Sequence, residues 1–248
     1  MPLATMHTFS SAFSQSDFFG KLIFLSLFIL SFISWMTLLY KLWIMSEVNK
    51  HSSKILQILE KQKGHFLSLP IDSFPVKTLR EIPQPFLKIL SVIKNKTGEL
   101  LEKNHYFIQE HERHSPSVYL SRADIDLIEN HLSSAIMSQK ELLEKNLFVL
   151  STITTLAPFI GLLGTVWGIL MTFSGLQLSG NFASNNLILG GLSTALATTV
   201  LGLLIAIPSL VAYNFLRQKI KSFTCQMEDF AHLLLSTVEI QYRKVDLK

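Results

Sequence analysis

Residues 146–216 read NLFVLSTITTLAPFIGLLGTVWGILMTFSGLQLSGNFASNNLILGGLSTALATTVLGLLIAIPSLVAYNFL, without one Asp, Glu, Lys, Arg or His. A helix needs roughly 20 apolar residues to cross a bilayer core, so these 71 residues have room for two crossings and a turn. Gly, Ser and Asn gather at 174–186 and mark the turn. We therefore expect transmembrane helices at 147–173 and 187–213, joined as an uncharged hairpin.

Small and hydroxyl residues recur every three or four positions on both expected helices. Such steps place them on one face of a helix, and small faces let membrane helices approach closely. Helix packing, including packing against neighbouring copies, is the simpler interpretation, and composition alone favours it. The packing residues would be Pro158, Gly161, Gly164, Gly168, Gly202, Ala206 and Pro208. The alternative is that Thr165 and Thr199 line a path for ions or protons.

Two runs in the hairpin carry a resemblance. They are APFIGLLGTVWGI at 157–169 and GLSTALATTVLGL at 191–203, the second followed by Ala206-Ile207-Pro208 and Tyr213-Asn214. Both runs resemble the signature of the TolQ/ExbB family, whose members are inner-membrane stator proteins of bacterial motors driven by the proton gradient. The close match covers the second and third membrane helices, and elsewhere only the layout is similar.

The resemblance implies a ring of five copies around a pair of single-span partners of the TolR/ExbD type. A partner Asp would carry the proton, with Thr165 and Thr199 facing the pore and Thr194 and Thr198 beside them. The family usually has a membrane Glu at the position of Thr194. An acid inside the membrane is a functional residue by default, so its replacement means that a proton relay needs the partner's acid. It also keeps a non-conducting scaffold open as an alternative.

A further apolar run precedes the hairpin. Residues 22–40 are 19 uncharged residues between Lys21 and Lys41. The run is long, its start is not basic, and Trp35 and Tyr40 suit a membrane interface better than a cleavage site. We expect a retained first transmembrane helix rather than a signal peptide.

Positive charge predicts the orientation. Lysines follow the first span and Arg217, Lys219 and Lys221 follow the third, whereas the turn has no positive charge. Because cytoplasmic segments are enriched in Lys and Arg, the N-terminus and the turn should be periplasmic. The expected segments are 1–20 periplasmic, 21–45 transmembrane, 46–145 cytoplasmic, 146–174 transmembrane, 175–186 periplasmic, 187–216 transmembrane and 217–248 cytoplasmic. The expected fold is an all-α polytopic protein of the bacterial inner membrane, with three transmembrane helices and long cytoplasmic helical extensions.

The cytoplasmic segments should also be helical. Residues 41–145 have 15 Lys/Arg and 13 Asp/Glu, a mixed and solvated composition. Prolines at 70–85 should end the continuation of the first helix, and a helix is expected at about 85–113. Ser121 is a plausible N-cap of a helix that we expect to run unbroken to Phe173. A packing seam should continue the third membrane helix, against this chain or another copy, through Ile220, Phe223, Met227, Phe230, Leu234 and Thr237.

Several classes of function lack support in the sequence. A zinc site needs three or four convergent ligands, and a solvated surface explains His105, His111, Glu112, His114 and His131 better. We expect no metal, no cofactor and no enzyme, because no phosphate loop, HExxH or nucleophile elbow is present. No basic and aromatic motif supports nucleic-acid binding. The single Cys225 excludes a disulfide framework within the chain.

The expected function is a stator subunit of a TolQ-like, Tol-Pal-type motor that maintains the outer membrane during division. An ExbB-like subunit that energises TonB-dependent uptake and a non-conducting scaffold are the alternatives. A secondary transporter has little support, because three spans give no inverted repeat. TolQ is preferred because the flagellar motor's fourth helix is absent and the N-terminus is short. The expected partners are a TolR/ExbD-like single-span protein, a TolA/TonB-like protein, further copies of the chain and the lipid bilayer.

Overall fold

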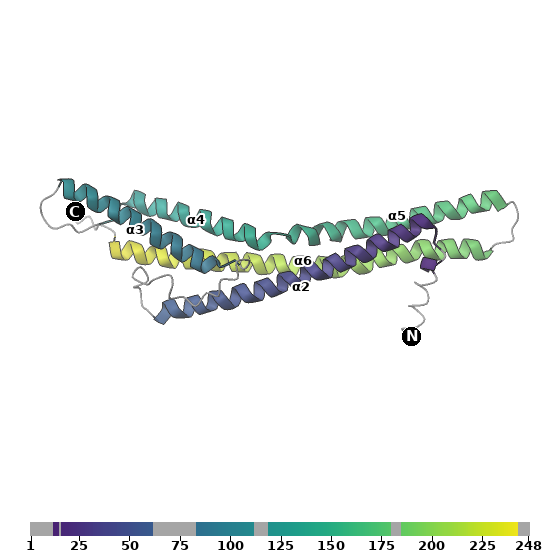
Figure 1. Ribbon diagram of the computed structural model, residues 1–248, viewed down its shortest axis with the longest axis horizontal. Coiled ribbons are helices and arrows are strands. Elements are labelled where there is room, and N and C mark those ends of the chain that lie inside the picture. The colour runs from purple at the N-terminus through teal and green to yellow at the C-terminus, as the bar shows by residue number, and fades with distance from the viewer. Residues whose placement is uncertain (1–11, 15, 62–82, 112–118, 180–184, 243–248) are drawn as a thin grey trace. The chain divides into compact units, whose positions relative to one another are not determined.

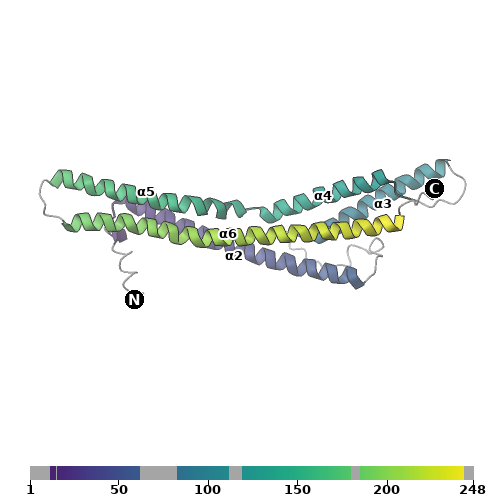
Figure 2. The same ribbon diagram turned by 180° about the vertical axis from the view of Figure 1, so that it is seen from behind.

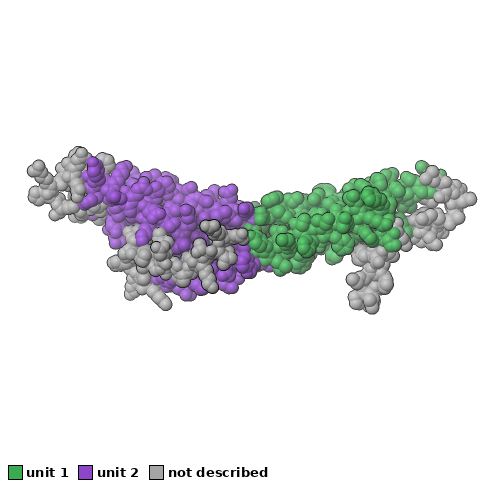
Figure 3. Space-filling view, in the orientation of Figure 1, with its two compact units in different colours: residues 1–41, 146–217 green, residues 42–145, 218–248 purple. Residues whose placement is uncertain are grey.

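The computed structural model describes residues 12–14, 16–61, 83–111, 119–179 and 185–242. This part of the chain is all-α, as expected (Figure 1). Its five long helices are α2 (Phe18–Lys61), α3 (Pro85–His111), α4 (Arg122–Glu144), α5 (Leu147–Ser179) and α6 (Asn185–Tyr242). The helices divide into two compact units, coloured green and purple in Figure 3: residues 1–41 with 146–217, and residues 42–145 with 218–248.

Each apolar span lies wholly or partly in the first unit. Among the described residues, three helical segments are long and apolar enough to cross a membrane, which confirms the predicted number: Phe18–Leu59, Leu147–Gly175 and Gly190–Tyr242. Large apolar side chains such as Phe28, Phe32 and Phe159 point outward and are mostly exposed, as a lipid-facing surface would be. Helices α5 and α6 run side by side in both Figure 1 and Figure 2.

The core of the first unit is small. Ile23 and Leu27 of α2 pack on Ile153 and Ala157 of α5 and on Ala206 of α6. Further along α2, the buried hydroxyls of Ser34 and Ser209 form a hydrogen bond of 2.6 Å. Lipid gives no hydrophobic drive for helix association, so such packing and polar contacts hold membrane helices together.

A two-residue break separates α4 from α5, so the prediction of one helix over 122–173 was wrong. Asn146 adopts the left-handed conformation at φ 65°, which Asn tolerates better than most residues. The amide of Lys145 still closes the last turn of α4 on the carbonyl of Glu141 (2.9 Å). Two prolines, in contrast, do not interrupt their helices: Pro158 lies inside α5 and Pro208 inside α6.

In the second unit, α4 starts at the predicted cap. Ser121 Oγ accepts the amide of Asp124, and Asp124 Oδ2 accepts the amide of Ser121 in return, which is a capping box. Burial raises the pKa of Asp124, but hydrogen bonds from Ser121 and Asn104 outweigh it and hold that pKa below its usual value. The amide of Leu120 also donates to the carbonyl of Tyr242 at 2.8 Å, which ties the start of α4 to the end of α6.

The predicted seam on α6 packs against the same chain. The ring of Phe86, on α3, lies 5.6 Å from that of Phe223 and 4.7 Å from that of Phe230, measured between centroids. The five apolar seam residues are buried, whereas Thr237 is half-buried and the neighbouring Val238 is fully buried in its place. The sequence left open whether this seam contacts the chain's own helices or another copy. In the structure, the seam contacts α3 of the same chain.

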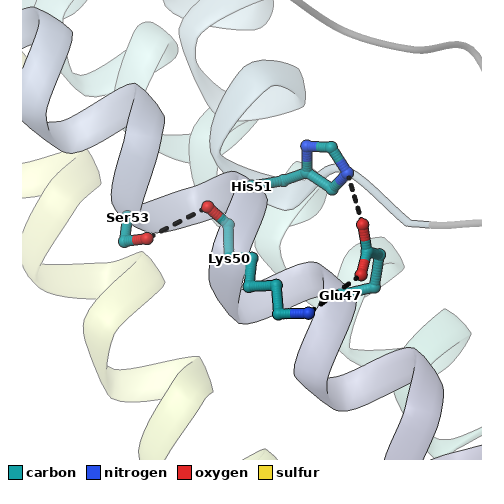
Figure 4. Close-up of polar contacts among 4 residues, drawn as sticks. All are labelled: Glu47, Lys50, His51 and Ser53. Atoms are coloured by element: carbon teal, nitrogen blue, oxygen red, sulfur yellow. Dashed lines mark hydrogen bonds and ion pairs between the residues drawn. The ribbon is translucent and has the colours of Figure 1, made fainter.

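Charges on α2 in the second unit form local pairs (Figure 4). Glu47 lies 3.3 Å from Nε2 of His51 and 3.6 Å from Nζ of Lys50. Ser53 Oγ donates to the carbonyl of Lys50 at 3.0 Å. Solvated pairs one helical turn apart contribute little to stability, so we interpret this cluster as a solvated helix surface.

Candidate functional site

Glycines bring α5 and α6 into backbone contact. A Cβ added to Gly161 would lie 2.9 Å from the carbonyl oxygen of Thr198, and one added to Gly202 would lie 2.6 Å from that of Ala157. A Cβ on Gly164 would meet the Thr198 side chain directly. No real Cβ approaches a backbone atom so closely, so α5 and α6 keep this spacing only with glycine at these positions.

This contact corrects one part of the packing prediction. The small faces were expected to pack against neighbouring copies, but the glycine face of α5 is filled by α6 of the same chain. Ala206 lies in the core of this unit, and Pro158 is half-buried in α5. Pro208 is exposed and lines a groove of about 290 Å³ between α2 and α6, together with Ser34 and Ser209.

The four candidate pore threonines all donate their hydroxyl protons to backbone carbonyls. Thr198 and Thr199 share one acceptor, the carbonyl of Gly161, at 3.2 and 3.0 Å. Thr165 donates to Leu162 at 2.6 Å, and Thr198 also reaches Ala195 at 2.7 Å. Thr194 reaches the carbonyls of Gly190, at 2.9 Å, and Ala12, at 3.3 Å.

Burial separates the four threonines into two pairs. Thr198 is 1% exposed and Thr194 is 9% exposed, so both lie inside the unit. Thr165 and Thr199 are half-buried and keep part of their surface open. Of these four threonines, therefore, Thr165 and Thr199 are the two that keep part of their surface for a partner. The pore-lining role of all four residues stays a prediction.

Sequence reasoning missed Asp17, the single carboxylate of the first unit. Its Oδ1 accepts the amide of Gly20 and its Oδ2 accepts the indole Nε1 of Trp167, both at 2.9 Å. The ring of Phe19 lies 4.4 Å from that of Trp167. A lone Asp before an apolar helix is an N-cap signal, which could have found the first bond. The second joins residues 150 positions apart and has no local signal.

The histidine cluster does not form a metal site in the part of the chain that the structure describes. Among those residues, no three His, Cys, Asp or Glu side chains lie close enough together to hold an ion. Glu112 and His114 lie outside the described residues. Cys225 is an exposed free thiol on α6.

Comparison with known proteins identifies the family of the chain. A model of the MotA/TolQ/ExbB proton channel family matches residues 100–229, just over half of the chain. The biopolymer transport protein ExbB of Aquifex aeolicus is 43% identical over 94 residues, which are 38% of this chain and 62% of that protein. The protein of the same name from Xanthomonas campestris is 34% identical over 113 residues, 46% of this chain and 44% of its own length.

A longer match is to the ExbB of Pseudomonas putida, 31% identical over 154 residues, 61% of this chain and 46% of that protein. The chain thus covers about half the length of these curated relatives. The matched region of the family model includes all of α4 and α5 and both of the runs that suggested the resemblance. The chain therefore belongs to the MotA/TolQ/ExbB proton channel family.

Proposed function

We propose that this chain is the proton-path subunit of an energiser in the bacterial inner membrane and works with a single-span partner of the TolR/ExbD type. One observation carries the proposal: Thr165 and Thr199 are only half-buried, and they lie in a stretch without Asp, Glu, Lys, Arg or His. Because the chain belongs to a proton channel family, we interpret their open surface as part of a proton path. The chain would supply oxygen atoms along the path, and the partner would supply the acid.

The mechanism follows from this division of roles. A proton that crosses an apolar region needs a titratable group or an ordered chain of water. Because α5 and the membrane part of α6 have no Asp, Glu, Lys, Arg or His, and Asp17 is engaged with Gly20 and Trp167, we infer that the titratable group is a carboxyl of the partner helix. That carboxyl would take up a proton at one side, pass Thr165 and Thr199, and release it at the other.

The assembly and orientation belong to the same proposal. Five copies would surround a pair of partner helices, with residues 1–20 and 175–186 periplasmic and residues 46–145 and 217–248 cytoplasmic. The excess of Lys and Arg after the first and third spans supports this orientation. Native mass spectrometry in mild detergents tests the copy number, and a clean monomer in several of them would contradict the ring.

Proton flux into liposomes tests the central step. A pH-sensitive dye and an imposed potential would compare the chain alone, the chain with its partner, and the chain with a partner whose membrane Asp is changed to Asn. We expect flux from the second sample only. Flux from the chain alone would refute the need for a partner acid, and no flux from any assembled sample would favour the scaffold.

The threonines have a matched control. Thr165→Val/Thr199→Val keeps the side-chain shapes but removes the hydroxyls, so we expect flux to fall while the complex still assembles. Thr155→Val removes a similar hydroxyl, because Thr155 also donates to the carbonyl three residues earlier, but from the exposed start of α5. Full flux in the double variant, or equal losses in both variants, would contradict a pore-lining role.

Two envelope systems compete for this subunit. A TolQ-like role in outer-membrane maintenance is the expectation from the sequence, whereas an ExbB-like role has the support of the matched relatives, which are named biopolymer transport protein ExbB. Affinity purification from native membranes distinguishes them. A TolR-like and TolA-like pair of copurified proteins would favour the first, and an ExbD-like and TonB-like pair would favour the second.

A further inference from the structure

Asp17 joins two helices with its two oxygen atoms. Oδ1 accepts the amide of Gly20, three residues on, and so caps the start of α2. Oδ2 accepts the indole N–H of Trp167 on α5. The Phe19 ring packs on the same indole, with 4.4 Å between ring centroids. An ionised carboxylate makes hydrogen bonds roughly twice as strong as those of a neutral acceptor.

The residues just before Asp17 reach the third helix of the unit. The carbonyl of Ala12 accepts the hydroxyl of Thr194 on α6 at 3.3 Å. Ser16 Oγ donates to the same carbonyl at 2.7 Å. A Cβ added to Gly20 would lie 2.9 Å from Asp17 Oδ1. The absence of a side chain at Gly20 therefore leaves room for the Asp17 carboxylate that caps α2.

Trp167 and Thr194 lie at one level of the α5–α6 pair. A Cβ on Gly168, the neighbour of Trp167, would lie 2.8 Å from the Cβ of Ala195, the neighbour of Thr194. Asp17 therefore contacts α5 and Ala12 contacts α6 at the same level. Thr194 is 9% exposed at this contact.

We propose that Asp17 is a positioning residue, which fastens the start of α2 to α5 through Trp167 and so holds Ala12 and Ser16 over Thr194. We call this set of contacts the N-terminal clasp: Ala12, Ser16, Asp17, Gly20, Trp167 and Thr194. The clasp rests on the geometry of this chain, and its effect on proton flow rests on the proposed function.

The chemistry of Asp17 gives a selective way to open the clasp. In Asp17→Asn, the one remaining oxygen can still cap Gly20, but the amide group then faces the indole with a donor where an acceptor is needed. Trp167→Phe removes the donor and keeps an aromatic ring against Phe19. The two variants therefore break the same hydrogen bond from opposite sides while the cap of α2 survives.

Thiol labelling at position 194 measures how well the clasp shields this position, without any flux measurement. In the full chain with Cys225→Ser and Thr194→Cys, we expect Asp17→Asn and Trp167→Phe each to raise maleimide reactivity on the order of tenfold, the factor for one charge-assisted hydrogen bond. The double variant should gain no more than either single variant. Lys21→Gln is the control, because it removes a nearby exposed charge but no clasp contact, and it should change nothing.

Spectroscopy of the indole gives a second reading. With Trp35 and Trp43 replaced by Phe, Trp167 is the only tryptophan left of three. We expect Asp17→Asn to shift the ultraviolet resonance Raman band that reports indole N–H hydrogen bonding. An unchanged band, or additive effects of the two variants on labelling, would overturn the clasp.

Flux then tests the consequence for transport. In liposomes that contain the chain and its partner, we expect Asp17→Asn to lower proton flux several-fold while the complex remains assembled. Normal flux with an opened clasp would overturn the positioning role. If the wild-type complex itself carries no protons, the proposed function fails, and the labelling and Raman results still decide whether the clasp exists.

Discussion

The single helix α6 packs in two different ways along its length. In the first unit it meets α5 through Ala195, Thr198 and Gly202, with backbone atoms in contact. In the second unit it presents Phe223, Met227 and Phe230, all buried, and the two phenylalanines contact the ring of Phe86 on α3. One continuous helix thus changes from a glycine–threonine face to a bulky aromatic seam.

The difference follows from the two surroundings that the sequence predicts. Where water is excluded from both the packed and the open faces, burial of apolar area brings no gain, so helices adhere by close approach and by hydrogen bonds such as Thr199 to Gly161. Where the open face meets water, burial of a large side chain contributes about 1.5–3 kcal/mol. The same helix therefore uses small residues in one part and large ones in the other.

Removal of one large ring should have the greatest effect on the second unit. Phe86 is 1% exposed, so we expect Phe86→Ala to lower the free energy of unfolding by about 3–5 kcal/mol through lost burial and a cavity. Hydrogen exchange of α3 amides measures this. Leu127→Ala on the exposed side of α4 is the control and should stay within about 0.5 kcal/mol. Equal effects would mean that the seam is not the core.

Addition of one methyl group should be damaging only in the first unit. Gly202→Ala puts a Cβ 2.6 Å from a carbonyl oxygen of α5, and overpacking of this kind costs about 1–3 kcal/mol. Thermal unfolding in detergent, followed by circular dichroism, measures the loss. An unchanged midpoint would show that α5 and α6 can separate without cost, and would break the contrast between the two regions.

Acid should loosen the start of α4 in the second unit. Because the pKa of Asp124 is lower in the folded chain than in the unfolded one, its stabilisation is complete above the unfolded-state pKa. It is lost as the pH falls through the folded-state pKa. Asp124→Ala removes the N3 partner of the capping box, so it should cost about 1 kcal/mol at neutral pH, as for one hydrogen bond, and remove this pH dependence. Hydrogen exchange at residues 122–125, corrected for intrinsic rates, measures both effects, with Asp126→Ala as the control.

The smallest effect should have the opposite sign. Gly98, inside α3, is exposed and has no atom within 4 Å of an added Cβ. Gly98→Ala should therefore stabilise the second unit by about 0.5–1 kcal/mol, because alanine loses less entropy in a helix than glycine. Chemical denaturation of the two proteins side by side measures this gain. A loss would indicate that another molecule approaches α3 at this position.

Much of the fold follows from local sequence signals. The cap at Ser121, the apolar seam from Ile220 to Leu234 and the three apolar spans all depend on residues within a few helical turns. The break at Asn146 could not be predicted in the same way. The break consists of Lys145 and Asn146, neither of which is a strong helix breaker such as glycine or proline. Asn is acceptable both in a helix and in the left-handed conformation that it adopts here.

The candidate site was less accessible to sequence reasoning. Spacing placed the glycines of α5 on one face, but we expected neighbouring copies to cover that face, whereas α6 of the same chain does. Residue type alone could not separate Thr198, which is buried, from Thr199, which is not. The bond between Asp17 and Trp167 depends on how three helices meet, and no periodicity encodes that.

The hydroxyls of Thr165 and Thr199 have one more consequence. Each has given its single proton to a backbone carbonyl, so toward any partner it presents lone pairs alone. A neutral carboxylic acid can donate to such a surface, whereas a carboxylate finds no donor on it. On the proposed proton path, the chain would therefore discriminate between the two protonation states of the partner's acid without a charge of its own. The neutral carboxylic acid would pass these threonines more easily than the carboxylate.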